Sequence, residues 1–90
     1  IYYFLADQKY VTVRHKNGSV LIDETLKDLE NEFGEKFIRI HRNALVAVNY
    51  LDGLEVVHAG QYQVRCREIN EKLAVSRRNL PLLRERMQKL

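Results

Sequence analysis

Short apolar runs separated by turn residues restrict the fold of this chain more than any other feature of its sequence. Each run suits a strand, because a strand needs only a few residues, whereas an amphipathic helix needs roughly ten or more. Several runs also alternate between apolar and polar residues, which is the period of a strand. We therefore predict a mainly β fold with about eight short strands, at residues 1–6, 10–16, 20–22, 37–41, 45–48, 54–57, 62–66 and 73–75.

Turn signals stand between the predicted strands. Asn17-Gly18 is the strongest hairpin signal in the chain, because both residues tolerate positive φ. Asp52-Gly53 is also predicted to form a turn, and Ala59-Gly60 and Asn70-Glu71 are predicted to join the later strands in hairpins. These positions favour an antiparallel arrangement of neighbouring strands.

Two segments have helical spacing instead. In residues 25–33, Thr25 can cap a helix, Asp28 can complete a capping box, and Gly34 can end it. A second amphipathic helix is predicted from Asn79 to the end of the chain, with Pro81 in its first turn. The apolar positions are Leu26, Leu29 and Phe33 in the internal helix and Leu80, Leu83, Met87 and Leu90 in the C-terminal one.

Length and composition indicate a single domain. Ninety residues suffice for one modest core, so we treat 1–90 as one unit. Cys66 is the only cysteine, which excludes an internal disulfide and fits a reducing compartment. We expect Cys66 to be a small buried hydrophobic residue. No run is long enough to span a bilayer and no signal peptide is present, so we expect a cytoplasmic protein. Because the chain begins abruptly with a strand, we expect further sequence before Ile1.

The charges are unevenly distributed along the chain. Residues 1–36 contain five Lys or Arg and seven Asp or Glu, whereas residues 37–90 contain ten and five, for a net charge of +3. The basic part can attract phosphate groups while the acidic helix points away from them. A solvated basic helix without a partner is the other interpretation of the same charges.

Enzyme and metal-binding classes find little support. His15, His41 and His58 lack the spacing of metal-ligand motifs, and Cys66 has no partner in CxxC spacing. The chain contains neither a GxSxG motif nor a glycine-rich phosphate loop. The carboxylates gather on the helix at 25–33, where solvation explains them. We therefore predict no enzymatic activity, no metal site and no cofactor.

Nucleic-acid binding fits three polar segments at the ends of predicted elements. A rigid β scaffold can present side chains from such ends. Arg can fork onto guanine and Asn can pair with adenine, whereas Lys, Tyr and Ser suit phosphate oxygens. The three segments are Asp7-Gln8-Lys9-Tyr10, His41-Arg42-Asn43 and Ser76-Arg77-Arg78-Asn79.

Each polar residue also has a structural interpretation, and the sequence leaves both open. His41 can bond a backbone carbonyl, which we favour over a base contact. Arg39 can pair with a carboxylate of the acidic helix. Asn43 can turn the chain, Asn79 can be the N-cap of the last helix, and Tyr10 can pack across its strand pair.

The segment FIRIHRNALVAVNYLDGL (37–54) resembles the signature of the LytTR family of bacterial DNA-binding domains. LAVSRRNLPLL (73–83) resembles the closing motif of that family, and YYFLADQKYVTV (2–13) resembles its opening strands. The similarity covers essentially the whole chain, and the acidic helix TLKDLENEF falls at the expected place. Within the family, the chain is most similar to the output domains of alginate-regulator-type response regulators.

This resemblance implies an elongated sandwich of three small β-sheets, with one short internal helix and a C-terminal helix. It implies the output domain of a two-component response regulator, preceded by a receiver domain and dimeric on DNA through that domain. The implied partner is double-stranded DNA, with loops entering successive major grooves at direct-repeat promoter sites.

The resemblance also implies which residues contact DNA. They are Lys9 and Tyr10 in the first loop, Arg42 beside His41 and Asn43 in the second, and Arg78 beside Arg77 and Asn79 in the third. Tyr10 departs from relatives that have histidine there, which leaves its base preference open. The alternative function is a protein-interaction module that uses the amphipathic helix at 80–90.

Overall fold

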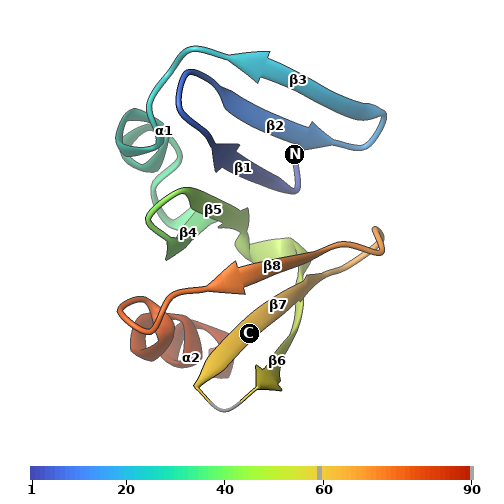
Figure 1. Cartoon of the computed structure of the whole chain (residues 1–90), viewed down its shortest axis with the longest axis vertical. Coiled ribbons are helices and arrows are strands. Elements are labelled where there is room, and N and C mark those ends of the chain that lie inside the picture. Colours follow the sequence, from blue (N-terminus) through green and yellow to red (C-terminus); the bar gives the residue numbers. More distant parts are fainter. Residues whose placement is uncertain (59, 90) are drawn as a thin grey trace.

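The fold is mainly β, as the sequence predicted (Figure 1). The computed structural model describes residues 1–58 and 60–89. In that part of the chain, no helix is long and apolar enough to cross a membrane. The elements described are the strands β1 (Tyr3–Ala6), β2 (Val11–His15), β3 (Gly18–Ile22), β4 (Phe37–His41), β5 (Ala44–Ala47), β6 (Leu51–His58), β7 (Gln61–Cys66) and β8 (Lys72–Val75), the helices α1 (Leu26–Phe33) and α2 (Leu80–Gln88), and the 3-10 helices η1 (Gly34–Lys36) and η2 (Val48–Tyr50).

The strands described form two antiparallel sheets, and not the three sheets that we expected. Their orders are β3-β2-β1-β5-β4 and β6-β7-β8. The larger sheet arises because β1 pairs along both edges: Tyr3 lies opposite Arg14 of β2 and also opposite Val46 of β5. Extents of 33 × 25 × 25 Å show that the molecule is only slightly elongated.

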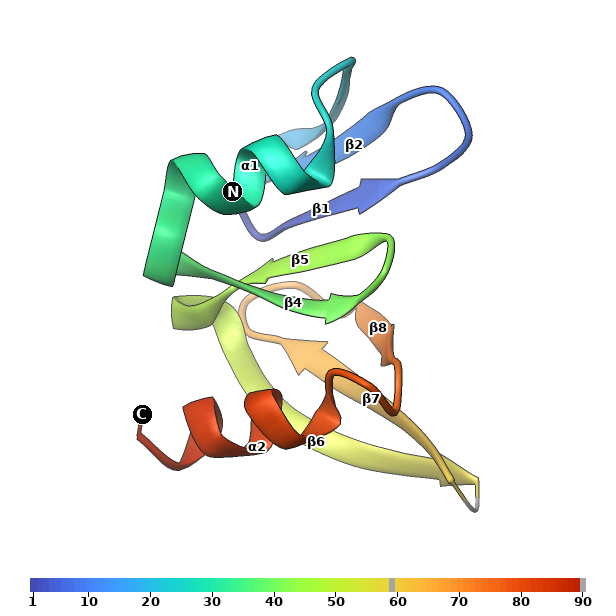
Figure 2. The same ribbon diagram turned by 90° about the vertical axis from the view of Figure 1, so that its left-hand side faces the viewer.

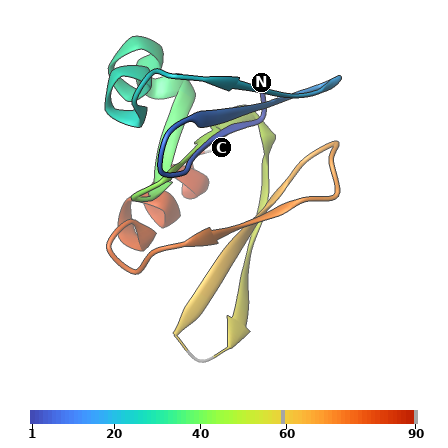
Figure 3. The same cartoon turned by 45° about the horizontal axis from the view of Figure 1, so that its top comes forward.

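Alternate side chains of β1 enter two different cores. Phe4 packs with Leu26 and Leu29 of α1 on one face of the five-stranded sheet. Tyr3 enters a second core that joins the five-stranded sheet, the three-stranded sheet and α2. The continuously apolar segment at the N-terminus is therefore covered on both faces, as its composition indicated. Figure 3 shows the β6–β7 hairpin extending away from the five-stranded sheet.

Helix α1 begins and ends where the sequence predicted. The hydroxyl of Thr25 accepts a hydrogen bond from the Asp28 backbone N–H at 3.1 Å, which is the N-cap bond. Gly34 ends the helix at a φ of +56°, a conformation that favours glycine. These signals fix the two ends of the acidic helix, which lies beside β4.

Several of the turn predictions differ from the structure. In the first hairpin His15 pairs with Gly18, so the turn consists of Lys16 and Asn17 and is one residue earlier than expected. Asp52-Gly53 is no turn, since it lies inside β6 at a register shift.

The guanidinium of Arg65 lies close to the glycine inside β6. A Cβ on Gly53 would lie 2.8 Å from Nη2 of Arg65, so a larger residue there would require this flexible side chain to move. A β7–β8 hairpin is present, as predicted, but its turn lies at Arg67 and Glu68 and not at Asn70-Glu71. In the β6–β7 connection, Ala59 lies outside the described residues.

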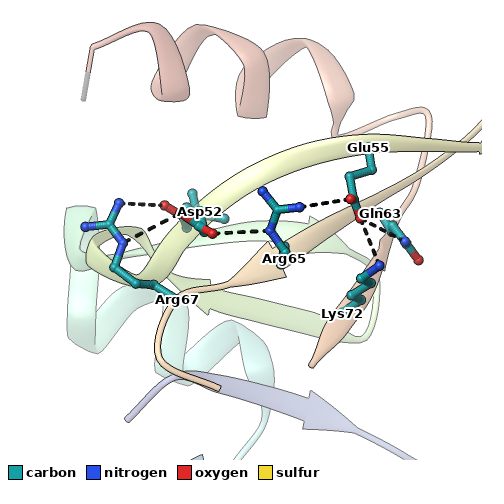
Figure 4. A network of polar contacts seen from close by, with 7 residues as sticks. Asp52, Glu55, Gln63, Arg65, Arg67 and Lys72 are labelled. Atoms are coloured by element: carbon teal, nitrogen blue, oxygen red, sulfur yellow. Dashed lines mark hydrogen bonds and ion pairs between the residues drawn. The ribbon is translucent and has the colours of Figure 1, made fainter. Parts of the chain in front are cut away.

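A network of polar side chains ties together the strands of the smaller sheet (Figure 4). Arg65 of β7 pairs with Asp52 at 3.2 Å and with Glu55 at 2.9 Å, both of β6. Lys72 of β8 lies 3.3 Å from Glu55. These pairs are partly exposed, so each stabilises the fold only weakly. They engage two cations that are therefore not free to bind a partner.

Helix α2 uses its apolar side for the fold itself. Leu80 and Leu83 are buried in the larger core, and Met87 packs against it. Leu90 lies outside the described residues. Asn79 occupies the N-cap position, but its side chain makes no capping hydrogen bond. Cys66 is buried, as predicted.

Candidate nucleic-acid interface

The three polar segments singled out in the sequence lie along one side of the molecule. They follow one another down the left side of Figure 1 and the right side of Figure 2. Each connects two elements: residues 7–10 join β1 to β2, residues 42–43 join β4 to β5, and residues 76–79 join β8 to α2. The β2–β3 and β7–β8 turns lie on the opposite side in Figure 1. The fold thus brings together segments that are far apart in the sequence.

Backbone hydrogen bonds link the bases of these three loops. The N–H of Ala6, before the first loop, donates to the carbonyl of Asn43 in the second at 2.7 Å. The N–H of Ser76 in the third loop donates to the carbonyl of Ile40, just before the second, at 2.9 Å. The second loop is therefore fixed between the other two, and the three loops form one continuous edge.

The first loop is folded around Asp7. Its carboxylate accepts hydrogen bonds from the backbone N–H groups of Lys9 at 2.9 Å and Tyr10 at 3.0 Å. The same two bonds lower the pKa of the Asp7 carboxyl below its ordinary value. The side chains of Lys9 and Tyr10 are left exposed, Tyr10 by 46%. Tyr10 therefore projects from the loop and is not covered by its strand pair.

The second loop is held by Arg39. The guanidinium donates to the carbonyls of His41 at 2.9 Å and Arg42 at 2.7 Å, and to the Glu30 carboxylate of α1 at 2.5 Å. The predicted pairing of Arg39 with a helix carboxylate is thus confirmed. Arg42 itself is exposed.

The two neighbours of Arg42 have different environments from it. Half-buried His41 does not follow the expectation of a bond to a carbonyl, because its Nδ1 accepts from the N–H of Asn43 at 3.4 Å. Asn43 lies in the turn between β4 and β5, as its structural interpretation indicated.

The third loop contains two arginines with different surroundings. Nε of Arg77 donates to the carbonyl of Gly60 at 3.2 Å, so its guanidinium lies on the β6–β7 connection. Arg78 is exposed. The hydroxyl of Ser76 donates to Oδ1 of Asn79 at 2.5 Å, which explains why the Asn79 side chain does not cap α2. No sequence signal indicated the contact between Arg77 and Gly60, because these residues are far apart in the chain.

Arg42 and Arg78 border the same hollow, together with Arg39, His41, Ser76 and Asn79. Arg42 also borders a second hollow, which Lys9 and Tyr10 line as well. The side chains of all three loops are therefore neighbours. Acidic Asp23 and Glu24 border this second hollow as well, so the separation of charge expected from the sequence holds only in part.

The cations in the three loops differ from several others in the fold, which pair with carboxylates. These others are Arg14, Arg39, Arg65 and Lys72. Within residues 1–58 and 60–89, Lys9, Arg42 and Arg78 have no ion-pair partner. Exposed, unpaired cations close together on one edge of a rigid scaffold suit a polyanionic partner.

A mainly β domain that presents such cationic loops on one edge falls in the class of nucleic-acid-binding domains that use loops. Comparison with known proteins identifies the family. The sequence matches the family model of the LytTR family, described as the LytTr DNA-binding domain, over residues 1–88. The chain belongs to the LytTR family of DNA-binding domains.

Two known proteins resemble the chain, one in sequence and one in fold. The chain is 47% identical over 91 residues to the positive alginate biosynthesis regulatory protein of Pseudomonas aeruginosa strain PAO1, covering 100% of this chain. It spans 37% of the length of that protein. The fold matches a solved LytTr DNA-binding domain from Bacillus cereus with a TM-score of 0.86 and 20% identity, over 97% of this chain and 80% of that one. The predicted family is confirmed, and so is the predicted resemblance to an alginate regulatory protein.

Proposed function

We propose that this domain binds double-stranded DNA sequence-specifically and is the output domain of a response regulator that controls transcription. Its family supports DNA binding. The specific function finds support in the edge formed by the three loops, since only contacts to base edges distinguish one sequence from another. The observation that carries the proposal is that exposed Arg42 and Arg78 border one hollow without ion-pair partners among the described residues.

In this proposal the residues of the edge have different roles. Arg42 and Arg78 donate to guanine edges in the major groove, because a guanidinium can form two bonds to one guanine. Lys9 and Arg77 contact phosphates, and Tyr10 can donate to or accept from a base or a phosphate. His41, Asn43 and Asn79 border these contacts, and polar groups at such positions can bond DNA directly or through water.

The whole protein forms a further part of the proposal. The relative with an assigned role is a regulatory protein of which this chain spans 37%. We place a receiver domain before Ile1, dimerisation through that domain, direct-repeat promoter sites and a cytoplasmic location in this proposal. The interaction-module alternative is not favoured, because α2 already buries Leu80 and Leu83 in the core.

Substitution of the two arginines tests the proposal. A binding site is first selected from a random duplex library, and affinities are measured for that site and for a scrambled duplex. Arg42→Ala and Arg78→Ala should each weaken binding to the selected site by about 1–3 kcal/mol, because each removes a bidentate contact to a base. Both variants should stay folded, since the two side chains are exposed.

Two other variants show whether the losses are specific. Lys16→Ala, in the β2–β3 turn on the opposite side, should leave binding unchanged. Lys9→Ala should weaken binding to both duplexes equally and reduce the slope of log K against log salt by about one, since it removes a phosphate contact. Wild-type affinity of both arginine variants for both duplexes would contradict the proposal.

A further inference from the structure

The guanidinium of Arg39 lies where the second loop meets helix α1. Of its nitrogens, Nε bonds the carbonyl of His41, Nη2 bonds the carbonyl of Arg42 and Nη1 bonds the carboxylate of Glu30. The two carbonyls are consecutive in the loop that carries the Arg42 side chain. One planar group therefore fixes the backbone at Arg42 and anchors it to a helix.

The path of β4 explains how Arg39 reaches this place. Arg39 pairs with Leu45 across the sheet, and Leu45 belongs to the core that α1 covers, so the Arg39 side chain faces that helix. The register then shifts between Arg39 and His41. Such a bulge bends the strand and turns the following residues. The carbonyls that follow this shift, those of His41 and Arg42, both accept hydrogen bonds from the guanidinium.

The position of Arg39 relative to the candidate interface is also unusual. Its side chain borders both the hollow shared by Arg42 and Arg78 and the hollow that contains Lys9. With a side chain only 26% exposed and a carboxylate partner at 2.5 Å, it is engaged within the protein. The exposed Arg42 lacks such engagement, so the two arginines three positions apart have different tasks.

We propose that Arg39 is a positioning residue, which holds the Arg42 loop in the conformation that meets DNA and uses Glu30 of α1 as its anchor. This inference rests on the proposed function for the role of Arg42. The acidic helix thereby becomes part of the DNA-binding apparatus, although its own charge would repel phosphates. A direct phosphate contact by Arg39 is the alternative that the experiment must separate from this one.

The experiment compares substitutions that keep or remove parts of this arrangement. Arg39→Lys keeps the charge but cannot bond two carbonyls and a carboxylate at once, because an ammonium lacks the planar fork. Arg39→Gln also removes the charge, and Glu30→Gln removes the charge of the anchor. Arg65→Lys is the matched control. The guanidinium of Arg65 likewise has several partners, the carboxylates of Asp52 and Glu55, but it lies in the smaller sheet.

Two measurements are made on each variant. Amide hydrogen exchange and chemical shifts of residues 40–43 are recorded without DNA, and affinities are measured for the selected and the scrambled duplex. We expect Arg39→Lys to change the loop amides and to lose about tenfold in affinity for the selected site only. Arg39→Gln should do the same at least as strongly, Glu30→Gln less strongly, and Arg65→Lys should do neither.

The outcomes distinguish the possible failures. Unchanged loop amides together with wild-type discrimination in Arg39→Lys would overturn the inference. Equal losses on both duplexes in Arg39→Gln but not in Arg39→Lys, with a reduced salt slope, would show a phosphate contact and would overturn it too. If the wild type does not discriminate between duplexes, the proposed function fails, and a loop that shifts in Arg39→Lys would then leave Arg39 as a structural residue only.

Discussion

The arginines in and near the three loops have different surroundings. Arg39 is bonded within the protein, and Arg77 donates to the carbonyl of Gly60 although it is exposed, as Arg42 and Arg78 are. The presence of these arginines predicted a binding site, but it did not predict which of them would be bonded within the protein. The partners of Arg39 and Arg77 are brought close only by tertiary structure, so the sequence could raise the pairing of Arg39 with a helix carboxylate but could not place the partner of Arg77.

At the same scale, the burial of Cys66 gives a testable chemical property. Burial raises the pKa of its thiol to about 11. The thiolate is the reactive form, so a disulfide reagent should label the folded protein very slowly at about pH 8 and rapidly once a denaturant unfolds it. Labelling is followed spectrophotometrically with and without denaturant. Equal rates in both conditions would contradict the burial of this thiol.

At the scale of elements, features that depend on neighbouring residues could be predicted from the sequence, whereas the pairing of strands could not. The helix bounded by Thr25 and Gly34 was predictable because its cap and its end depend on neighbouring residues. The single large sheet was not, because pairing between β1 and β5 joins segments about forty residues apart, beyond the reach of local periodicity. Asp52-Gly53 was mistaken for a turn because its pairing with Arg65 of β7 depends on a residue outside the local sequence.

A contact between elements supports a prediction about acid stability. The Glu71 carboxylate, beyond β7, accepts hydrogen bonds from the Tyr3 hydroxyl at 2.5 Å and from Nε of Arg14 at 2.8 Å. These bonds lower the pKa of Glu71 below its ordinary value of 4.5. A lowered pKa in the folded state means that the stabilisation is present above the unfolded value and is lost as the pH falls through the folded one.

Glu71→Gln should therefore lower the free energy of unfolding near neutral pH and have less effect in acid. Urea titrations of both proteins at about pH 7 and about pH 3 measure this difference. Arg67→Gln is a suitable control, because Arg67 lies 3.9 Å from Asp52 and is 59% exposed. An equal destabilisation by Glu71→Gln at both pH values would show that the ionised carboxylate contributes nothing.

At the scale of the whole molecule, the two sheets serve to align loops from three separate parts of the chain. The bonds from Ala6 to Asn43 and from Ser76 to Ile40 run between these parts. The candidate residues could be selected from the sequence by their chemistry and by the family resemblance. Their placement on one edge could not be derived from spacing, since it depends on the pairing of β1 with β5 and on the packing of the smaller sheet against the larger one.

Chemical-shift mapping of the domain with DNA tests the central claim most directly. The backbone amides of the isotope-labelled domain are followed as a duplex carrying the selected site is added. The account predicts that the largest changes fall in residues 7–10, 41–43 and 76–79, and that the β2–β3 and β7–β8 turns stay unchanged. Changes concentrated in those two turns, or in α2 alone, would contradict it.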